Sequence, residues 1–239
     1  MFGPQRTPRA KNQDSAESPF WISYSDLMTA LMVLFLVAMA VALLGVTHGL
    51  RKMDETRQTR ASAIQNCLSD MATITQKPEF QGARLRGQTI EFGPLAEFPK
   101  NSNMPDTRHI GALRSLVPQI LEAARSPQCQ TWLKRFVLEG YASQEGSYLH
   151  NLNLSLERSQ RVLCVLLDAQ APQAPSLTDR KAIRELFLVG GSSFNSAVTN
   201  SPEKSRRVEL RLEFKELRDT EASTALPWDD DFKCPVINR

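Results

Sequence analysis

One carboxylate in this sequence stands at the edge of a long apolar segment. Asp26 directly precedes a run from Leu27 to Val46 in which Thr29 is the one polar side chain. About 20 apolar residues in a helix cross the hydrocarbon core of a membrane. A charge inside that core costs on the order of 2.5–3.5 kcal/mol, so carboxylates there usually face a partner or a water-filled path. Asp26 is therefore a candidate proton-carrying group. The alternative is an N-cap of the helix, with the carboxylate in water.

The apolar run predicts a single membrane helix over residues 21–46, preceded by a polar tail over 1–20. Trp21 and Tyr24 stand where aromatic rings favour the headgroup zone. A cleaved signal peptide is an alternative, because small residues flank Met39, but the run continues to Val46, beyond the usual length of such a segment. No second run of this kind follows, which excludes a transporter or channel with several spans.

The side chains around Asp26 form a recognisable pattern. Its members are Trp21, Tyr24, Met28, Thr29, Ala30, Leu31, Met32 and Phe35. This spacing resembles the membrane helix of MotB-type stator subunits of ion-driven motors. The resemblance implies that Asp26 carries the transported ion, a proton, with sodium as the alternative, and that no cofactor is needed. It also makes Tyr24 and Thr29 possible residues of the ion path, although helix packing would explain both equally.

Residues 47–84 read as a polar linker that contains a short amphipathic helix. Ile64, Leu68 and Met71 recur at helical spacing. Such a segment can dimerise or plug a pore in stators. A plain spacer helix is the interpretation that we favour.

From Leu85 onward the pattern predicts an α+β domain, a mixed sheet backed by helices, over residues 85–216. Strands are expected at 89–92, 136–138, 187–189 and 208–214, with helices at 110–124, 149–166 and near 183–186. The last strand alternates apolar residues with Glu209, Arg211, Glu213 and Lys215, which predicts one buried and one wet face. Residues 217–239 read as a tail.

Three short motifs lie within this domain. They are Gly140-Tyr141-Ala142-Ser143, then Asn151-x-x-Leu154-Ser155-x-x-Arg158, and then Ser205-Arg206-Arg207-Val208-Glu209-Leu210. Together they resemble the OmpA-like peptidoglycan-binding domain.

The resemblance implies a binding site for a cell-wall stem peptide. Arg158 would bind a carboxylate with its guanidinium fork, and the Asn151 amide would bind peptide backbone. Leu154 and Arg207 would shape the pocket. Helix capping and core packing are the alternatives for Asn151 and Leu154, and an ion pair is the alternative for Arg207. Ser143 replaces the aspartate of the family pattern, and Glu145 is a candidate to take over the role of that carboxylate.

The four cysteines are far apart in the sequence and have no metal-binding spacing. An even number permits two disulfides outside the cytosol. We favour Cys164 with Cys234, because a tail with little pattern would be tied back to the domain, which leaves Cys67 with Cys129. Four free thiols are the alternative.

Other chemistry is not indicated. The sequence has no Gly-x-Ser-x-Gly, phosphate loop or His-Glu-x-x-His motif, and its three histidines are isolated, so we expect neither an enzyme nor a metal site. Asp229, Asp230 and Asp231 could bind calcium, but a solvated acidic tail is the simpler interpretation. The net charge of +3, without basic clusters, argues against nucleic acid as a partner.

Two further segments carry a more specific likeness. They are Val137-Leu138-Glu139-Gly140 and Phe187-Leu188-Val189-Gly190-Gly191-Ser192-Ser193-Phe194-Asn195. They are similar to the ZorB family, the stator-like subunits of Zorya anti-phage defence systems, and the likeness extends through most of the chain. It implies a proton-driven stator in which a dimer of this chain stands inside a pentamer of ZorA-like membrane subunits.

The location is inferred from the wall-binding motif, because the positive charges on the two flanks of the membrane segment do not decide its orientation. We expect a single-pass protein of the bacterial inner membrane with a cytoplasmic N-terminus and a periplasmic C-terminal domain. A flagellar or Ton/Tol-like stator and a passive peptidoglycan anchor are the alternative functions.

Overall fold

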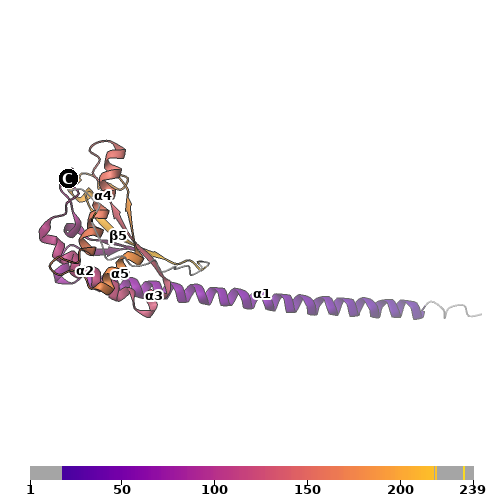
Figure 1. Cartoon of the computed structure of the whole chain (residues 1–239). Coiled ribbons are helices and arrows are strands. Elements are labelled where there is room, and N and C mark those ends of the chain that lie inside the picture. Colours follow the sequence, from indigo (N-terminus) through magenta and orange to yellow (C-terminus); the bar gives the residue numbers. More distant parts are fainter. Residues whose placement is uncertain (1–17, 218, 220–233, 235–239) are drawn as a thin grey trace, which may run out of the picture. The chain divides into compact units, whose positions relative to one another are not determined.

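The computed structural model describes residues 18–217, 219 and 234 (Figure 1). The chain divides into two compact units, residues 1–56 and residues 57–239. The first holds most of a long helix, α1 (Ser18–Thr75), and the second holds the last turns of that helix together with the sheet.

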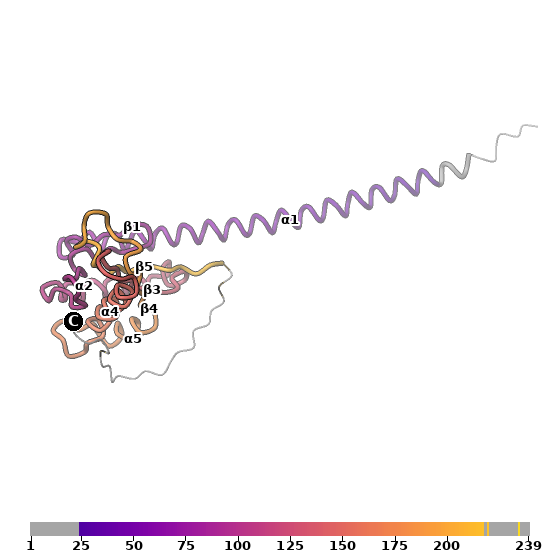
Figure 2. The backbone as a smooth tube through the Cα atoms, turned by 90° about the horizontal axis from the view of Figure 1, so that it is seen from above, coloured from indigo at the N-terminus to yellow at the C-terminus, as the bar shows by residue number. Residues whose placement is uncertain are grey.

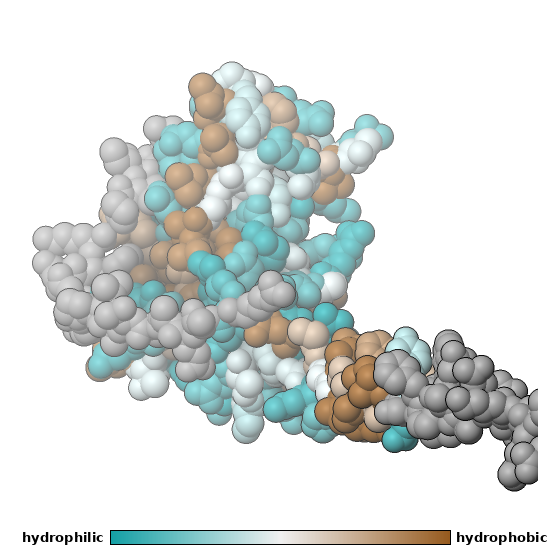
Figure 3. Space-filling model, turned by 90° about the vertical axis from the view of Figure 1, so that its right-hand side faces the viewer, coloured by the Kyte–Doolittle hydropathy of each residue, from teal (hydrophilic) through white to brown (hydrophobic). Residues whose placement is uncertain are grey.

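Helix α1 contains the predicted membrane segment. It is long and apolar enough to cross a membrane, the one such helix in the described part of the chain. Its apolar side chains are exposed on all sides, among them Phe35 and Leu44 with 68% and 69% of their surfaces accessible. In Figure 3 this stretch appears brown beside the grey N-terminal residues. A helix that is apolar all round requires lipid or protein around it, so a membrane environment accounts for the pattern.

The last turns of α1 belong to the second unit. Cys67 and Met71 are fully buried in its hydrophobic core, and Ile64 and Leu68 pack against that core. These residues form the predicted amphipathic face, although the sequence placed them in a linker ending at residue 84. Because the apolar face is occupied by the core of its own unit, residues 57–75 act as part of the folded domain.

The second unit is built on a five-stranded sheet in the order β1-β2-β5-β3-β4. The strands are β1 (Arg84–Arg86), β2 (Thr89–Glu91), β3 (Leu133–Gly140), β4 (Phe187–Gly191) and β5 (Val208–Phe214). Strand β4 runs parallel to β3, and every other pair is antiparallel. The four predicted strands are present, and β1 is an additional edge strand. The mixed sheet confirms the predicted α+β class.

Helices cover one face of the sheet, as Figures 1 and 2 show. The main ones are α2 (Thr107–Ala124), α4 (Tyr148–Leu167) and α5 (Leu177–Leu186), and shorter helical elements are η1 (Pro78–Phe80), η2 (Gly93–Ala96), α3 (Pro127–Trp132) and α6 (Pro202–Ser205). The side chains of Asp106, Ser147 and Ser176 accept hydrogen bonds from backbone N–H groups at the starts of the main helices. These caps fix where each helix begins.

Two glycines bring α4 into direct contact with the sheet. A Cβ atom at Gly140 would stand 1.9 Å from the carbonyl oxygen of Ser155, and one at Gly191 would stand 2.7 Å from the backbone nitrogen of Leu156. Only glycine permits backbones to approach this closely. The contact places the motif residues of α4 beside the end of β3.

The outer face of β5 is less exposed to solvent than the sequence predicted. Arg211 is exposed, but Glu209 is 7% exposed, so the expectation of a wet side chain there is wrong. Glu209 lies between Glu91 on β2 and Glu139 on β3 in the register of the sheet. The Arg207 guanidinium lies 2.6 Å from its carboxylate and compensates for the burial.

Both disulfides have the pairing that we favoured from the sequence. Cys67 is bonded to Cys129, and Cys164 to Cys234. The first joins α1 to α3, and the second joins α4 to a residue 70 positions later. The acidic residues Asp229–Asp231 lie outside the described residues.

Candidate functional site

The carboxylate of Asp26 lies on the surface of α1 in its own chain. The helix begins at Ser18, so Asp26 is in the helix interior and the N-cap alternative is wrong. The side chain is exposed, and no cation among the described residues pairs with it. A carboxylate beside an apolar helix surface therefore depends on water or on another chain for its polar contacts.

The two possible path residues differ in their relation to Asp26. Thr29 is three positions later and shares a helix face with it, whereas Tyr24, two positions earlier, does not. The Thr29 hydroxyl donates to the carbonyl oxygen of Ser25 at 2.7 Å, so its hydrogen is used within the helix. Its oxygen can still accept a hydrogen bond.

A second candidate site is a cavity at the end of β3. It has a volume of about 200 Å³ and lies between the loop that follows β3 and the segment that precedes β5. The lining residues are Ser143, Gln144, Glu145, Ala197, Val198, Thr199, Asn200, Ser201, Pro202 and Ser205. Ser143 and Glu145, both singled out by the sequence, therefore meet here.

Asn151 does not line this cavity but holds the backbone of Glu145, which does. Its side chain is 3% exposed, and its Nδ2 donates to the carbonyl oxygen of Glu145 at 2.8 Å. Leu154 is likewise buried, at 3% exposed. The Asn151 amide thus holds the loop after β3 in place, and the burial of Leu154 is compatible with the packing alternative.

Arg158 is placed differently from the role that the motif implied. The residue is fully buried, and its guanidinium donates to the carbonyl oxygens of Ser102, Tyr141 and Pro99 at 2.9, 3.0 and 3.2 Å. Its plane also lies over the Phe98 ring, 5.4 Å from the centroid. In this conformation Arg158 does not offer an open fork to a ligand, because its N–H groups join the loop around residue 100 to the end of β3.

The Arg158 cation lacks a carboxylate partner among the described residues. Burial, together with the smaller effect of the nearby positive charge of Arg206, lowers its pKa to about 10. A buried cation is normally compensated by an anion. The three carbonyls supply partial negative charge, while two of the five guanidinium N–H groups remain available to a further acceptor.

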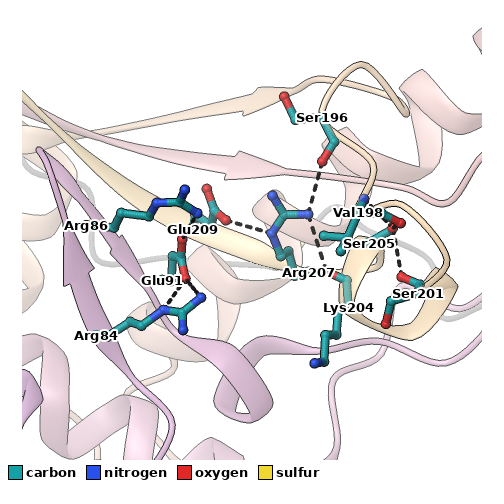
Figure 4. Close-up of polar contacts among 10 residues, drawn as sticks. All are labelled: Arg84, Arg86, Glu91, Ser196, Val198, Ser201, Lys204, Ser205, Arg207 and Glu209. Carbon is teal, nitrogen blue, oxygen red and sulfur yellow. Dashed lines mark hydrogen bonds and ion pairs between the residues drawn. The ribbon is translucent and has the colours of Figure 1, made fainter.

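Arg207 ties the lining segment of the cavity to the sheet (Figure 4). Its Nε donates to Glu209 at 2.6 Å, and its Nη1 lies 3.4 Å and 3.3 Å from the carbonyl oxygens of Ser196 and Lys204. Its guanidinium also stacks on the Tyr141 ring, 4.3 Å from the centroid. Arg207 thus positions the cavity wall, which combines the pocket-shaping role with the ion pair expected as its alternative.

The cavity wall has a second support that the sequence did not reveal. Ser205 is 1% exposed, and its Oγ accepts a hydrogen bond from the N–H of Val198 at 2.8 Å and donates to the carbonyl oxygen of Ser201 at 3.0 Å. Lys100 was also missed, although its Nζ lies 3.1 Å from Glu145 Oε1. Ser205 opens one of the three motifs but was given no role of its own, and Lys100 lies outside every motif, because both residues act through loops that only the fold brings together.

Comparison with known proteins finds matches to both parts. Residues 5–44 match the family described as membrane MotB of the proton-channel complex MotA/MotB. Among solved structures, the periplasmic domain of Helicobacter pylori MotB is 13% identical with a TM-score of 0.41, and the match covers 57% of this chain and 82% of that one. The cell-wall anchor of the Pseudomonas aeruginosa T6SS is 18% identical with a TM-score of 0.37, covering 61% and 97%.

A curated relative matches the chain along its whole length. The Zorya protein ZorB of Escherichia coli O139:H28 (strain E24377A / ETEC) is 38% identical over 249 residues, which span 100% of this chain and 96% of the relative. Identity at this level over the whole length shows that the chain belongs to the family of the Zorya protein ZorB.

Proposed function

We propose that this chain is a proton-driven stator subunit of a Zorya anti-phage defence complex. In this proposal Asp26 carries protons through the inner membrane, the N-terminus lies in the cytoplasm, and the second unit lies in the periplasm and binds peptidoglycan. A dimer of the chain would stand within a pentamer of ZorA-like subunits. Membership of the ZorB family supports the assignment to a defence system.

The observation that carries the proton role is the placement of Asp26. It lies inside the segment that matches the MotB proton-channel family and directly before the apolar run Leu27–Val46 of helix α1. Its carboxylate is exposed on that helix, so a ZorA-like partner could reach it directly. A charge that crosses 100 mV releases about 2.3 kcal/mol, which supplies work only when a group such as Asp26 controls the passage.

The second unit supplies the features that an anchor needs. A stator must resist the force that the moving subunits exert on it, so its membrane helix requires a firm connection to the wall-binding part. The last turns of α1 have this connection within the second unit, through the Cys67–Cys129 bond and the burial of Met71. Arg60 adds a hydrogen bond to the carbonyl oxygen of Lys215 at 2.9 Å.

The proton role is tested with Asp26→Asn and Asp26→Glu in cells that carry the complete operon. We expect Asp26→Asn to abolish protection in phage plaque counts, because an amide cannot carry a proton, while Asp26→Glu retains part of it. Asp54→Asn, on the same helix beyond the apolar run, is the matched control and should protect normally. Equal membrane levels of all variants must be verified by immunoblot.

The alternatives predict other results. A passive peptidoglycan anchor would protect fully with Asp26→Asn, and this result would refute the proton role. Co-purification of the tagged chain with a flagellar or Ton/Tol-like partner, in place of a ZorA-like subunit, would assign the stator to another machine. Wall binding is tested separately, by co-sedimentation of the detergent-solubilised full chain with purified peptidoglycan sacculi.

A further inference from the structure

The cavity beside Ser143 has the chemistry of a site for a ligand with a positively charged group. Of the described residues that line it, Glu145 alone is charged. Its other polar side chains are neutral, namely the hydroxyls of Ser143, Thr199, Ser201 and Ser205 and the amides of Gln144 and Asn200. Such a lining fits a peptide-like ligand that carries a primary ammonium group, because the hydroxyls and amides can bind its neutral polar groups.

The position of Glu145 is fixed although its side chain is accessible. The buried Asn151 amide donates to the Glu145 carbonyl oxygen and thereby holds its backbone. The side chain itself is 47% exposed, so the carboxylate is open to solvent. A fixed backbone with an open carboxylate is the arrangement that a cation-binding group requires.

The ammonium group of Lys100, a residue of the chain itself, already forms an ion pair with the Glu145 carboxylate. Lys100 Nζ lies 3.1 Å from Glu145 Oε1, and the Lys100 side chain is 61% exposed. The backbone on both sides of Lys100 is held by Arg158, which donates to the carbonyl oxygens of Pro99 and Ser102. The fold therefore keeps Lys100 at the rim of the cavity.

We propose that Lys100 is an internal competitor for the ligand ammonium, which binds Glu145 by replacing Lys100. An exposed ion pair of this kind is weak, so a ligand can break it readily. A ligand without an amine leaves the Lys100–Glu145 pair intact and gains no contact with the carboxylate. Lys100 and Glu145 thus determine which stem peptides the site accepts. This inference deepens the proposed wall-binding function and rests on it.

The test uses the full chain in lipid nanodiscs, titrated with two soluble muropeptides. One is a disaccharide tripeptide whose diaminopimelate has a free amine, and the other is the same compound with that amine acetylated. For Lys100→Met we expect up to about fivefold tighter binding of the free-amine compound and unchanged binding of the acetylated one. For Glu145→Gln we expect equal affinity for both compounds. Lys134→Met, which removes a lysine from an exposed pair with Asp219, is the matched control and should bind as the wild type does.

Several results would overturn the inference. One is unchanged or weaker binding of the free-amine muropeptide by Lys100→Met. Another is a preference for the free amine that persists in Glu145→Gln. The third is no binding of the free-amine muropeptide by any variant. Sacculus co-sedimentation reports on the wider function independently. Sacculi that bind the wild type and Glu145→Gln equally, without amine preference in the titration, would refute the role of the pair and keep the anchor function. A preference for the free amine in the titration, without binding to sacculi, would support the role of the pair and refute the anchor function.

Discussion

The backbone of Gly140 lies against the carbonyl oxygen of Ser155, at a distance that leaves no room for a side chain. A Cβ atom at Gly140 would stand 1.9 Å from that oxygen, so Gly140→Ala must push α4 away from β3. Overpacking of this kind costs about 1–3 kcal/mol or more. We expect the melting temperature of the second unit to fall by about 5–10 °C, measured by calorimetry of the full chain.

Gly190→Ala is the control for this prediction. A Cβ atom at Gly190 meets nothing within 4 Å, although Gly190 lies on β4 one position before Gly191. Its melting temperature should stay close to that of the wild type. Equal losses for the two alanine variants would mean that backbone freedom, and not the contact with Ser155, accounts for the effect.

A second prediction concerns the structural role of Arg158. Arg158→Met removes one donor from each of the carbonyl oxygens of Ser102, Tyr141 and Pro99, of which that of Pro99 keeps the N–H of Ser102 at 3.3 Å. Unsatisfied buried groups cost roughly 1–3 kcal/mol each before relaxation. We expect a loss of at least about 3 kcal/mol in the free energy of unfolding, measured in urea. Arg86→Met, which removes an exposed arginine from β1, should lose less than about 1 kcal/mol. An Arg158→Met protein as stable as the wild type would contradict this structural role.

The two disulfides should differ in their contribution to stability. They close loops of similar length, with sequence separations of 62 and 70, so their chain-entropy contributions are alike, at about 2–5 kcal/mol. Cys67 and Cys129 are fully buried, whereas Cys234 is only half-buried. We therefore expect the Cys67→Ala/Cys129→Ala pair to lower the melting temperature more than Cys164→Ala/Cys234→Ala does. The reverse order would indicate that the C-terminal segment contributes more to the fold than its burial suggests.

The pH dependence of stability should include a contribution from Asp179. Burial raises the pKa of this carboxyl, but hydrogen bonds from Ser176 and Arg125 outweigh burial and lower the pKa below its usual value of 3.8. The lowered pKa in the folded state stabilises the protein above pH 4, and this stabilisation is lost as the pH falls below that value. Melting temperatures between pH 7 and pH 3 should fall less steeply for Asp179→Asn than for the wild type. Parallel curves would contradict the prediction.

The sequence predicted the elements of the fold because their periodicities are strong. The apolar run, the alternation in β5 and the spacing of α4 each depend on local pattern, and each element was found. The boundary of the second unit could not be read in this way. The residues from Arg57 onward look like a polar spacer, and only the packing of Cys67 and Met71 against distant residues makes them part of the core.

The candidate wall site was predicted in part. The motif indicated Ser143, Asn151 and Arg207 at one end of the sheet, and the structure places them around one cavity. The role of Arg158 in ligand binding stays a prediction, and the three carbonyl contacts of its guanidinium could not be foreseen, because spacing on a helix shows which face a side chain occupies but not which loop carbonyls it meets. Lys100 could not be predicted, because its contact with Glu145 joins two loops that are far apart in the sequence.

The bond between Cys164 and Cys234 also has a consequence for the maturation of the protein. One sulfur lies on α4, and the other lies 70 residues later. If the second unit is exported as we propose, this bond cannot close until those residues have crossed the membrane. The Cys67–Cys129 bond needs a shorter exported stretch and can close earlier. The two bonds therefore form in sequence during export, and a chain arrested before Cys234 emerges keeps a single unpaired thiol on α4, by which oxidoreductases could distinguish it from a finished molecule.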